Sequence, residues 1–229
     1  SGARAGSPGL LLLDEPFANL DTATRRGLRI LVRELHERTR LPLVVVTHDR
    51  EDALELADRI AIMDRGRVVQ QGGVQEVFSH PATAVAAELV GVENLLRVSG
   101  LRPGPAGMVA AATALGEVTV AAPGRSAPAW VLAAPASALG VDREGAEATV
   151  QSARWSGEGW RVRALCGPAV LELDVAGGLM PELGSRLRVA LDGFRCHLLA
   201  SEEAPAEPSM AAWSDGEAAA RAGGSRPDR

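Results

Sequence analysis

The first 95 residues alternate apolar runs with amphipathic stretches, which predicts strands alternating with helices. Leu10 to Leu13 are all apolar and end at Asp14, as expected of a strand buried on both faces. Residues 43–46 form a second such run, rich in β-branched side chains, and the intervening helix should end before Pro42. The core positions of that helix are Leu28, Leu31, Val32 and Leu35. The order of elements predicts a parallel sheet with helices packed on it, an α/β fold.

Capping and turn signals complete the first part of the chain. Asp21 can cap the first helix, and Asp49 with Asp52 has the near-capping-box spacing of a second helix, whose buried side would come from residues 53–57. Residues 59–63 and 67–70 flank Asp64-Arg65-Gly66, a tight-turn signal that predicts a hairpin. A last helical stretch should run from residue 74 to about 90 with a break at His80-Pro81.

From about Gly100 the helical periodicity ends and a different pattern begins. Residues 170–175 and 186–191 are apolar at every second position, which predicts half-buried strands of a small all-β barrel of oligonucleotide/oligosaccharide-binding style. After Ser201 almost no large apolar residues remain, which predicts disorder. We therefore place an α/β domain at residues 1–95, a β-barrel domain at 96–200 and a disordered tail at 201–229.

Composition narrows the function. The formal net charge of -5 gives no basic field for a nucleic-acid partner. The two cysteines, Cys166 and Cys196, are too few for a disulfide scaffold, and we expect both to be buried apolar side chains. No apolar run approaches the length needed to cross a bilayer, so any membrane association should come through a partner. The chain contains no lysine, and its start at Ser1 suggests a piece of a longer reading frame.

Three polar side chains follow the two predicted strands. Asp14 and Glu15 come directly after the first strand, and His48 follows the second. The carboxyl ends of neighbouring parallel strands share one sheet edge, where α/β folds bind ligands. A carboxylate there can hold magnesium-bound water, and the next carboxylate can act as a general base on an attacking water. Taken singly, the acidic strand end could simply meet solvent, and the histidine could be structural.

Together these residues resemble the ATP-binding-cassette (ABC) ATPases. Leu-Leu-Leu-Leu-Asp-Glu-Pro at 10–16 looks like their Walker B strand, Ala-Asn-Leu-Asp at 18–21 like their D-loop, and Thr-His-Asp at 47–49 like their switch histidine. Residues 62–72 resemble the hairpin that follows in import-type subunits. Pro-Ala-Thr at 81–83 and Gly-Val-Glu-Asn at 91–94 continue the similarity.

The resemblance implies the carboxyl-terminal half of a P-loop NTPase (ABC) domain, followed by a small β-barrel similar to a TOBE domain. It implies ATP and Mg²⁺ as ligands, with Asp14 on Mg²⁺ through water, Glu15 as the general base and His48 on the γ-phosphate. Asn19, Leu20 and Asp21 would communicate across a dimer of two cassettes. The implied partners are a second copy or another ABC subunit, a membrane permease and, indirectly, a solute-binding protein, at the cytoplasmic face of the cell membrane.

Two parts of the ATP site of such ATPases are missing from this chain. The phosphate loop of such ATPases, Gly-x-x-x-x-Gly-Lys-Ser/Thr, needs a lysine, and the signature segment before Walker B is also absent. We therefore expect this chain alone neither to bind ATP tightly nor to hydrolyse it. The solute is not encoded in these motifs; by analogy with single-barrel importers we favour molybdate or sulfate over polyamines, iron or sugars.

Other functions stay open at this stage. A chromosome-organising or DNA-repair ATPase shares the Asp-Glu strand and the histidine, although the hairpin and the appended barrel speak against it. A non-enzymatic oxyanion sensor would use only the barrel, with Ser137, Ser152 and Ser156 available as ligands. A barrel that only makes dimer contacts, or a truncated gene product with no independent role, is the remaining alternative.

Overall fold

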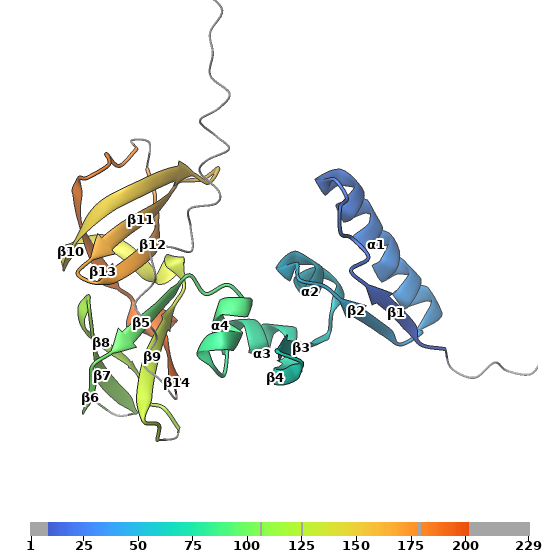
Figure 1. The fold of residues 1–229 in the computed structure, drawn as a ribbon, viewed down its shortest axis with the longest axis horizontal. Helices are drawn as coiled ribbons and strands as arrows, with labels where there is room; N and C mark the ends of the chain where they lie inside the picture. The colour runs from blue at the N-terminus through green and yellow to red at the C-terminus, as the bar shows by residue number, and fades with distance from the viewer. Residues whose placement is uncertain (1–8, 106, 125, 178–179, 202–229) are drawn as a thin grey trace, which may run out of the picture. The chain divides into compact units, whose positions relative to one another are not determined.

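The computed structural model describes residues 9–105, 107–124, 126–177 and 180–201. It divides the chain into two compact units between Val90 and Gly91 (Figure 1). We predicted a domain border after residue 95, and residues 94–98 pair with residues 130–134 of the second unit. Residues 202–229 of the predicted tail lie outside the described residues, and Ser201 ends a strand. The domain assignments themselves stay predictions.

The first unit is mixed α/β and begins with a strand–helix–strand arrangement. Strands β1 (Leu11–Asp14) and β2 (Leu43–Val46) pair in parallel, with Leu11 opposite Leu43 and Asp14 opposite Val46. Helix α1 (Thr22–Thr39) connects them, and α2 (Arg50–Leu56) follows β2. Asp21 caps α1 by accepting hydrogen bonds from the amides of Ala23 and Thr24. The predicted cap and the helix end before Pro42 are confirmed.

The predicted two-sided burial of these strands is wrong. Leu11, Leu13, Leu43 and Val45 are half-buried, whereas the alternate residues Leu12, Val44 and Val46 are exposed. Successive side chains of a strand point to opposite faces, so one face of this pair is covered and the other is open in the described chain. Helix α1 shows the same one-sided burial: Leu28 and Val32 are half-buried, but Leu31 and Leu35, which we assigned to the core, are exposed.

The predicted hairpin is confirmed, although its first strand does not extend the parallel sheet. β3 (Arg59–Asp64) and β4 (Arg67–Gly73) form their own antiparallel sheet. Arg65 and Gly66 have φ of 47° and 76°, the left-handed conformations of a two-residue turn that sends the chain straight back. Parallel pairing in the described chain is therefore limited to β1 and β2.

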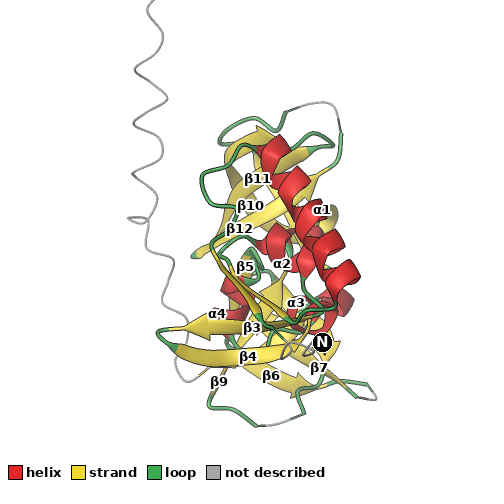
Figure 2. Cartoon of the chain, turned by 90° about the vertical axis from the view of Figure 1, so that its right-hand side faces the viewer, coloured by secondary structure: helices red, strands yellow, loops and turns green. Residues whose placement is uncertain are grey.

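Two short helices close the first unit. Helices α3 (Val74–Ser79) and α4 (Ala84–Leu89) are separated at His80-Pro81, as predicted, because the residue before a proline disfavours helical geometry. Gly91 follows with a φ of 78°. All four α-helices of the described chain precede Val90 (red in Figure 2), and none is long and apolar enough to cross a bilayer.

The second unit is strand-rich. It contains three antiparallel sheets, of strand order β12-β11-β10-β13, β14-β9-β5 and β6-β7-β8. The strands are β5 (Asn94–Val98), β6 (Gly100–Pro103), β7 (Met108–Thr113), β8 (Gly116–Ala121), β9 (Ala129–Ala134), β10 (Leu139–Trp155), β11 (Trp160–Cys166), β12 (Ala169–Val175), β13 (Arg186–Leu191) and β14 (His197–Ser201). Two 3-10 turns, η1 (Ala136–Ala138) and η2 (Gly193–Arg195), lie between strands.

An apolar core holds the second unit together. Leu171 and Leu173 of β12 and Val189 of β13 are fully buried, which confirms both strands predicted from alternating residues. Cys166 and Cys196 are buried free thiols, also as predicted. Burial raises the pKa of Cys196 to about 12, and the neighbouring charge of Asp192 adds to the shift, so the thiol stays neutral near pH 7.

Asn94 connects two of these sheets. Its buried amide donates to the carbonyls of Ala134 in β9 and Glu172 in β12, at 3.0 and 2.8 Å, and its oxygen accepts from the Glu172 amide at 2.7 Å. Both polar atoms of the side chain are thereby satisfied. The preceding Glu93 accepts from the Ala136 amide and pairs with Arg161. The Gly-Val-Glu-Asn motif thus has a clear structural role at the start of the second unit.

We predict that Asn94→Ala destabilises the second unit by roughly 2–4 kcal/mol, because one buried and two partly buried backbone groups lose their side-chain partner. Urea unfolding followed by tryptophan fluorescence measures this selectively, since all four tryptophans follow Gly91 in the sequence. The matched control Gln151→Ala removes an exposed amide from β10 and should change the free energy of unfolding by less than about 0.5 kcal/mol. Equal effects of the two substitutions would contradict the assignment.

Candidate functional site

The parallel pairing of β1 and β2 brings two strand ends to one edge. Asp14, the last residue of β1, lies opposite Val46, the last residue of β2. The amide of Glu15 then donates to the carbonyl of Val46 at 2.9 Å, which extends the pairing by one residue. Glu15 and His48 consequently emerge at the same sheet edge.

Glu15 and His48 are in direct contact. The Nδ1 atom of His48 lies 3.0 Å from Oε1 and 2.9 Å from Oε2 of Glu15. Both side chains remain open to solvent, with 41% of Glu15 and 81% of His48 exposed. Glu15 has a φ of 45°, a left-handed conformation that an amino acid with a side chain rarely adopts. The structure therefore brings together the predicted base and the predicted histidine on an accessible surface.

The contact favours the charged imidazole. The hydrogen bond that His48 donates to Glu15 and the negative charge of Glu15 raise the pKa of His48 above its ordinary value, with a smaller contribution from Asp49. Desolvation and the charge of Arg25 act in the opposite direction. A protonated ring can donate through Nδ1 to Glu15 while Nε2–H stays available to another acceptor, such as a phosphate oxygen.

The segment that follows Glu15 turns sharply into α1. The amide of Ala18 donates to the Glu15 carbonyl at 3.2 Å, and Asn19 has a left-handed φ of 63°. Asn19 is exposed and Leu20 is half-buried. Thr24 donates its hydroxyl to Asp21 at 2.6 Å, and the hydrogen bonds from Thr24 lower the pKa of Asp21. The carboxylate of Asp21 is thus engaged in capping, while Asn19 is presented to solvent.

Asp14 suits a magnesium ion held largely by other ligands. Its side chain is exposed at the end of β1, next to Glu15. Within the described ranges, no three His, Cys, Asp or Glu side chains form a group able to hold a metal. Mg²⁺ in phosphoryl-transfer sites commonly has only one or two protein carboxylates and takes its other ligands from water and phosphate. Asp14 fits that limited role.

The sequence analysis did not predict a network of ion pairs between α1 and the residues that follow His48. Arg29 of α1 donates through Nε to Asp52 of α2 at 2.6 Å, and the two side chains are only 4% and 3% exposed. Arg25 pairs with Asp49 at 2.6 Å. Asp49 caps α2 as predicted, through the Glu51 amide. Asp52 does not complete a capping box, because it serves Arg29 and Thr47 instead.

The sequence did carry a signal for this network. Arg25, Arg29 and Arg33 recur every fourth residue, so they lie on one face of α1. Of the apolar residues that we expected on the buried side of α2, Ala53, Leu56 and Ala57 are half-buried, as predicted, whereas Leu54 is exposed. The fully buried residue of that helix is Asp52. Polar pairing between the two helices therefore adds to partial burial of the apolar side, and the apolar pattern did not predict that pairing.

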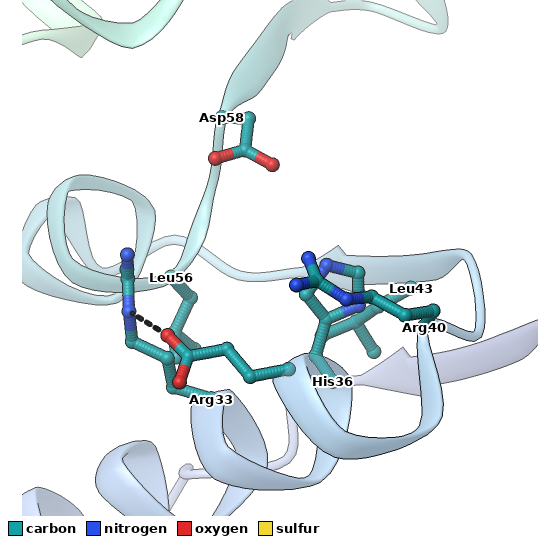
Figure 3. A pocket seen from close by; sticks show the side chains of 7 residues that line it. Arg33, His36, Arg40, Leu43, Leu56 and Asp58 are labelled. Carbon is teal, nitrogen blue, oxygen red and sulfur yellow. Dashed lines mark ion pairs between the residues drawn. The ribbon is translucent and has the colours of Figure 1, made fainter.

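A hollow in the first unit lies away from Glu15 and His48. It has a volume of about 140 Å³ near the carboxyl end of α1 and the start of β2 (Figure 3). Its lining is Arg33, His36, Glu37, Arg40, Leu43, Leu56 and Asp58. Arg33 and Glu37 form an ion pair there at 3.4 Å. None of the predicted site residues lines this hollow, and its mixed charges give it no clear preference for an anion.

The three serines considered as oxyanion ligands do not form one site. Ser137 lines a hollow of about 300 Å³ in the second unit, together with Asp142 and Asp192. Ser152 and Ser156 do not line this hollow, and the hydroxyl of Ser156 donates to Gly159 at 3.0 Å. The lining includes two acidic residues and no Arg or His, so the charge of the hollow does not favour an oxyanion.

Comparison with known proteins identifies relatives over most of the chain. No protein-family model matches the sequence. The sulfate/thiosulfate import ATP-binding protein CysA of Xanthomonas campestris is 41% identical over 203 residues, which cover 82% of this chain and 54% of that protein. The CysA proteins of Xylella fastidiosa and Rhizobium meliloti are 50% and 44% identical over 94 and 97 residues, which cover 41% and 42% of this chain and 27% and 28% of those proteins.

This chain spans about half the length of the Xanthomonas relative and about a quarter of the other two. All three relatives are named import ATP-binding proteins. This agrees with the family that the Walker B, D-loop and switch-histidine motifs predicted. The chain is therefore homologous to the ATP-binding proteins of ABC importers and matches the carboxyl-terminal portion of such a protein.

Proposed function

We propose that this chain supplies the hydrolytic carboxylate, the switch histidine and a TOBE-like β-domain to an ATP-hydrolysing subunit that drives solute uptake. The observation that carries the proposal is the Glu15–His48 contact at the shared end of two parallel strands. The names of the relatives support it independently. They favour an importer over a chromosome-organising or DNA-repair ATPase, and sulfate or thiosulfate over molybdate, polyamines, iron and sugars as the solute.

The proposed chemistry is water attack on the γ-phosphorus of ATP. Glu15 takes a proton from the water as the new P–O bond forms, and the bond to the leaving ADP oxygen breaks. His48, held by Glu15 at Nδ1, donates through its other nitrogen to a γ-phosphate oxygen, where negative charge is carried in the transition state. Mg²⁺ would neutralise phosphate charge, with Asp14 holding one of its waters. Asn19, Leu20 and Asp21 would contact the partner cassette.

The proposed partners follow from the same family. A second copy or another ABC subunit would complete each ATP site, and a membrane permease would bind the ATPase at the cytoplasmic face of the membrane. A solute-binding protein would take part indirectly. The three antiparallel sheets of the second unit support a TOBE-like domain, for which we propose a contact role rather than oxyanion sensing, because Asp142 and Asp192 flank the hollow that contains Ser137.

The chain alone should not hydrolyse ATP. It has no lysine to serve a phosphate loop, so the β- and γ-phosphates lack their principal cation. We expect phosphate release by the purified chain to equal that of its Glu15→Gln variant, and calorimetry to detect no tight ATP binding. Hydrolysis above the Glu15→Gln control would show that this expectation is wrong.

Joining the chain to the amino-terminal portion of the Xanthomonas relative should restore hydrolysis. In that chimera, Glu15→Gln should lower kcat by about 100- to 10,000-fold, the usual contribution of a general base. His48→Ala should lower kcat by about 100-fold, because one donor to the transition state is lost. The matched control is Glu34→Gln, which neutralises an exposed carboxylate on α1 and should leave kcat unchanged. An active chimera indifferent to Glu15→Gln would refute the assignment of the base.

The Glu15–His48 contact should also be visible as a pH effect in the chain itself. Since Glu15 raises the pKa of His48, Glu15→Gln should return it towards about 6.5, as followed by NMR titration of the imidazole. Because the pKa of His48 is higher in the folded than in the unfolded state, the contact adds to the free energy of unfolding. This contribution is complete below about pH 6.5 and is lost as the pH rises through the raised pKa. Glu34→Gln should leave the His48 titration unchanged. An unaltered titration in Glu15→Gln would mean that the contact does not form in solution.

A further inference from the structure

Helix α1 carries a row of three arginines that face α2. Arg25 pairs with Asp49 at 2.6 Å, Arg29 with Asp52 at 2.6 Å, and Arg33 donates to the carbonyl of Glu55 at 2.5 Å. Their four-residue spacing places them on one stripe of the helix. The two helices are therefore joined by charged hydrogen bonds along their contact.

Arg29 is the buried centre of this row. Besides Asp52, its guanidinium lies 3.1 Å from Glu51, 3.5 Å from Asp49 and 3.6 Å from Glu55. Desolvation lowers the pKa of Arg29, whereas the hydrogen bonds to Asp52 and Glu51 and the nearby negative charges raise it. The net shift is upward, so the guanidinium stays charged. Burying an ion pair seldom stabilises a fold more than apolar packing of the same volume. What such a pair does provide is a fixed geometry, because a guanidinium and a carboxylate match in few orientations.

Asp52, the hydrogen-bond partner of Arg29, also contacts the loop that carries His48. The second oxygen of Asp52 accepts from the hydroxyl of Thr47 at 2.7 Å, and the oxygen of that hydroxyl accepts from the amide of Asp49 at 3.0 Å. The residues on both sides of His48 are thus tied to the carboxylate that Arg29 holds. Arg25 and Arg29 add a second tie through the side chain of Asp49.

The other end of the connection is the segment that follows Glu15. Asp21 caps the first turn of α1, so Asn19 and Leu20 enter directly into the helix that carries Arg29. We propose that Arg29 is a positioning residue: it locks the Thr47-His48-Asp49 loop to helix α1, and so holds the imidazole in register with Glu15. On the proposed function, this makes α1 the mechanical connection between the D-loop-like segment and the switch-like histidine.

The test uses the full chain without nucleotide and compares Arg29→Met with Arg33→Met. The two arginines lie one turn apart on the same face, but Arg33 contacts Glu37 and the carbonyl of Glu55, both outside residues 47–52, and is 55% exposed. Two readouts are combined: hydrogen exchange of the amides of residues 47–52, and the imidazole ¹⁵N shifts of His48 at fixed pH, which report its hydrogen bond to Glu15. Arg29→Met should speed exchange roughly ten-fold or more and abolish the hydrogen-bonded Nδ1 signal. Arg33→Met should change neither.

Arg29→Met leaves Asp52 buried without its cation and can unfold the unit, so a second variant decides the matter. Arg29→Met combined with Asp52→Leu replaces the ion pair by apolar side chains and should keep the far-UV circular dichroism of the native chain. We expect this folded double variant to show the same fast exchange and the same loss of the His48 signal. Thr47→Val, which keeps the ion pair and removes its link to the loop, should reproduce both effects.

Two outcomes would overturn the inference. A folded double variant with native exchange and a native His48 signal would show that other contacts position the loop. A double variant that unfolds would make Arg29 a stabilising residue only. Neither outcome bears on ATP hydrolysis, which the chimera tests separately, and an inactive chimera would leave the positioning role of Arg29 untouched.

Discussion

The buried contact between Arg29 and Asp52 is the interaction on which the first unit most depends. The β1–β2 pair is small and has one open face, and both α1 and α2 expose leucines, so apolar burial alone gives little definition to the arrangement of these elements. The buried ion pair fixes the position of α1 relative to α2, because separating the guanidinium from the carboxylate would leave two buried charges unpaired. The ends of β1 and β2, and with them Glu15 and His48, are set by this frame.

The second unit is built on the opposite principle. Its core is continuous and apolar, and its sheets meet through fully buried leucine and valine side chains. Among the described residues of this unit, the buried polar side chain is Asn94, whose amide satisfies groups on two different sheets. Exposed ion pairs such as Arg186–Glu147 add little, because water and salt screen them. One unit therefore takes its geometry from charge pairing and the other from packing.

The sequence predicted best what local chemistry decides. The caps at Asp21 and Asp49, the hairpin at residues 59–73 and the break at His80-Pro81 depend on neighbours within a few residues, and the structure confirms them. The meeting of Glu15 and His48 could also be predicted, because parallel strands deliver their carboxyl ends to one edge.

What failed depended on contacts between distant segments. Leu31 and Leu35 have the right spacing for a core, but spacing does not reveal whether any element covers that side of the helix. The buried state of Asp52 requires Arg29, which lies 23 residues away and could not be paired with it from periodicity alone. The separate sheet of β3 and β4 likewise reflects a choice of partner that the strand–helix–strand order leaves open. The catalytic roles and the domain assignments stay predictions.

At position 15 the left-handed backbone favours glycine, whereas the proposed chemistry requires a carboxylate. A glycine would adopt a φ of 45° with less strain, whereas any other side chain there costs about 1–3 kcal/mol that the surrounding hydrogen bonds must offset. The carboxylate at this position, however, contacts His48 and is the proposed acceptor of the proton from water. Selection for thermal stability would therefore favour glycine at position 15, and selection for turnover would favour glutamate. The residue at this position shows which of the two properties was selected.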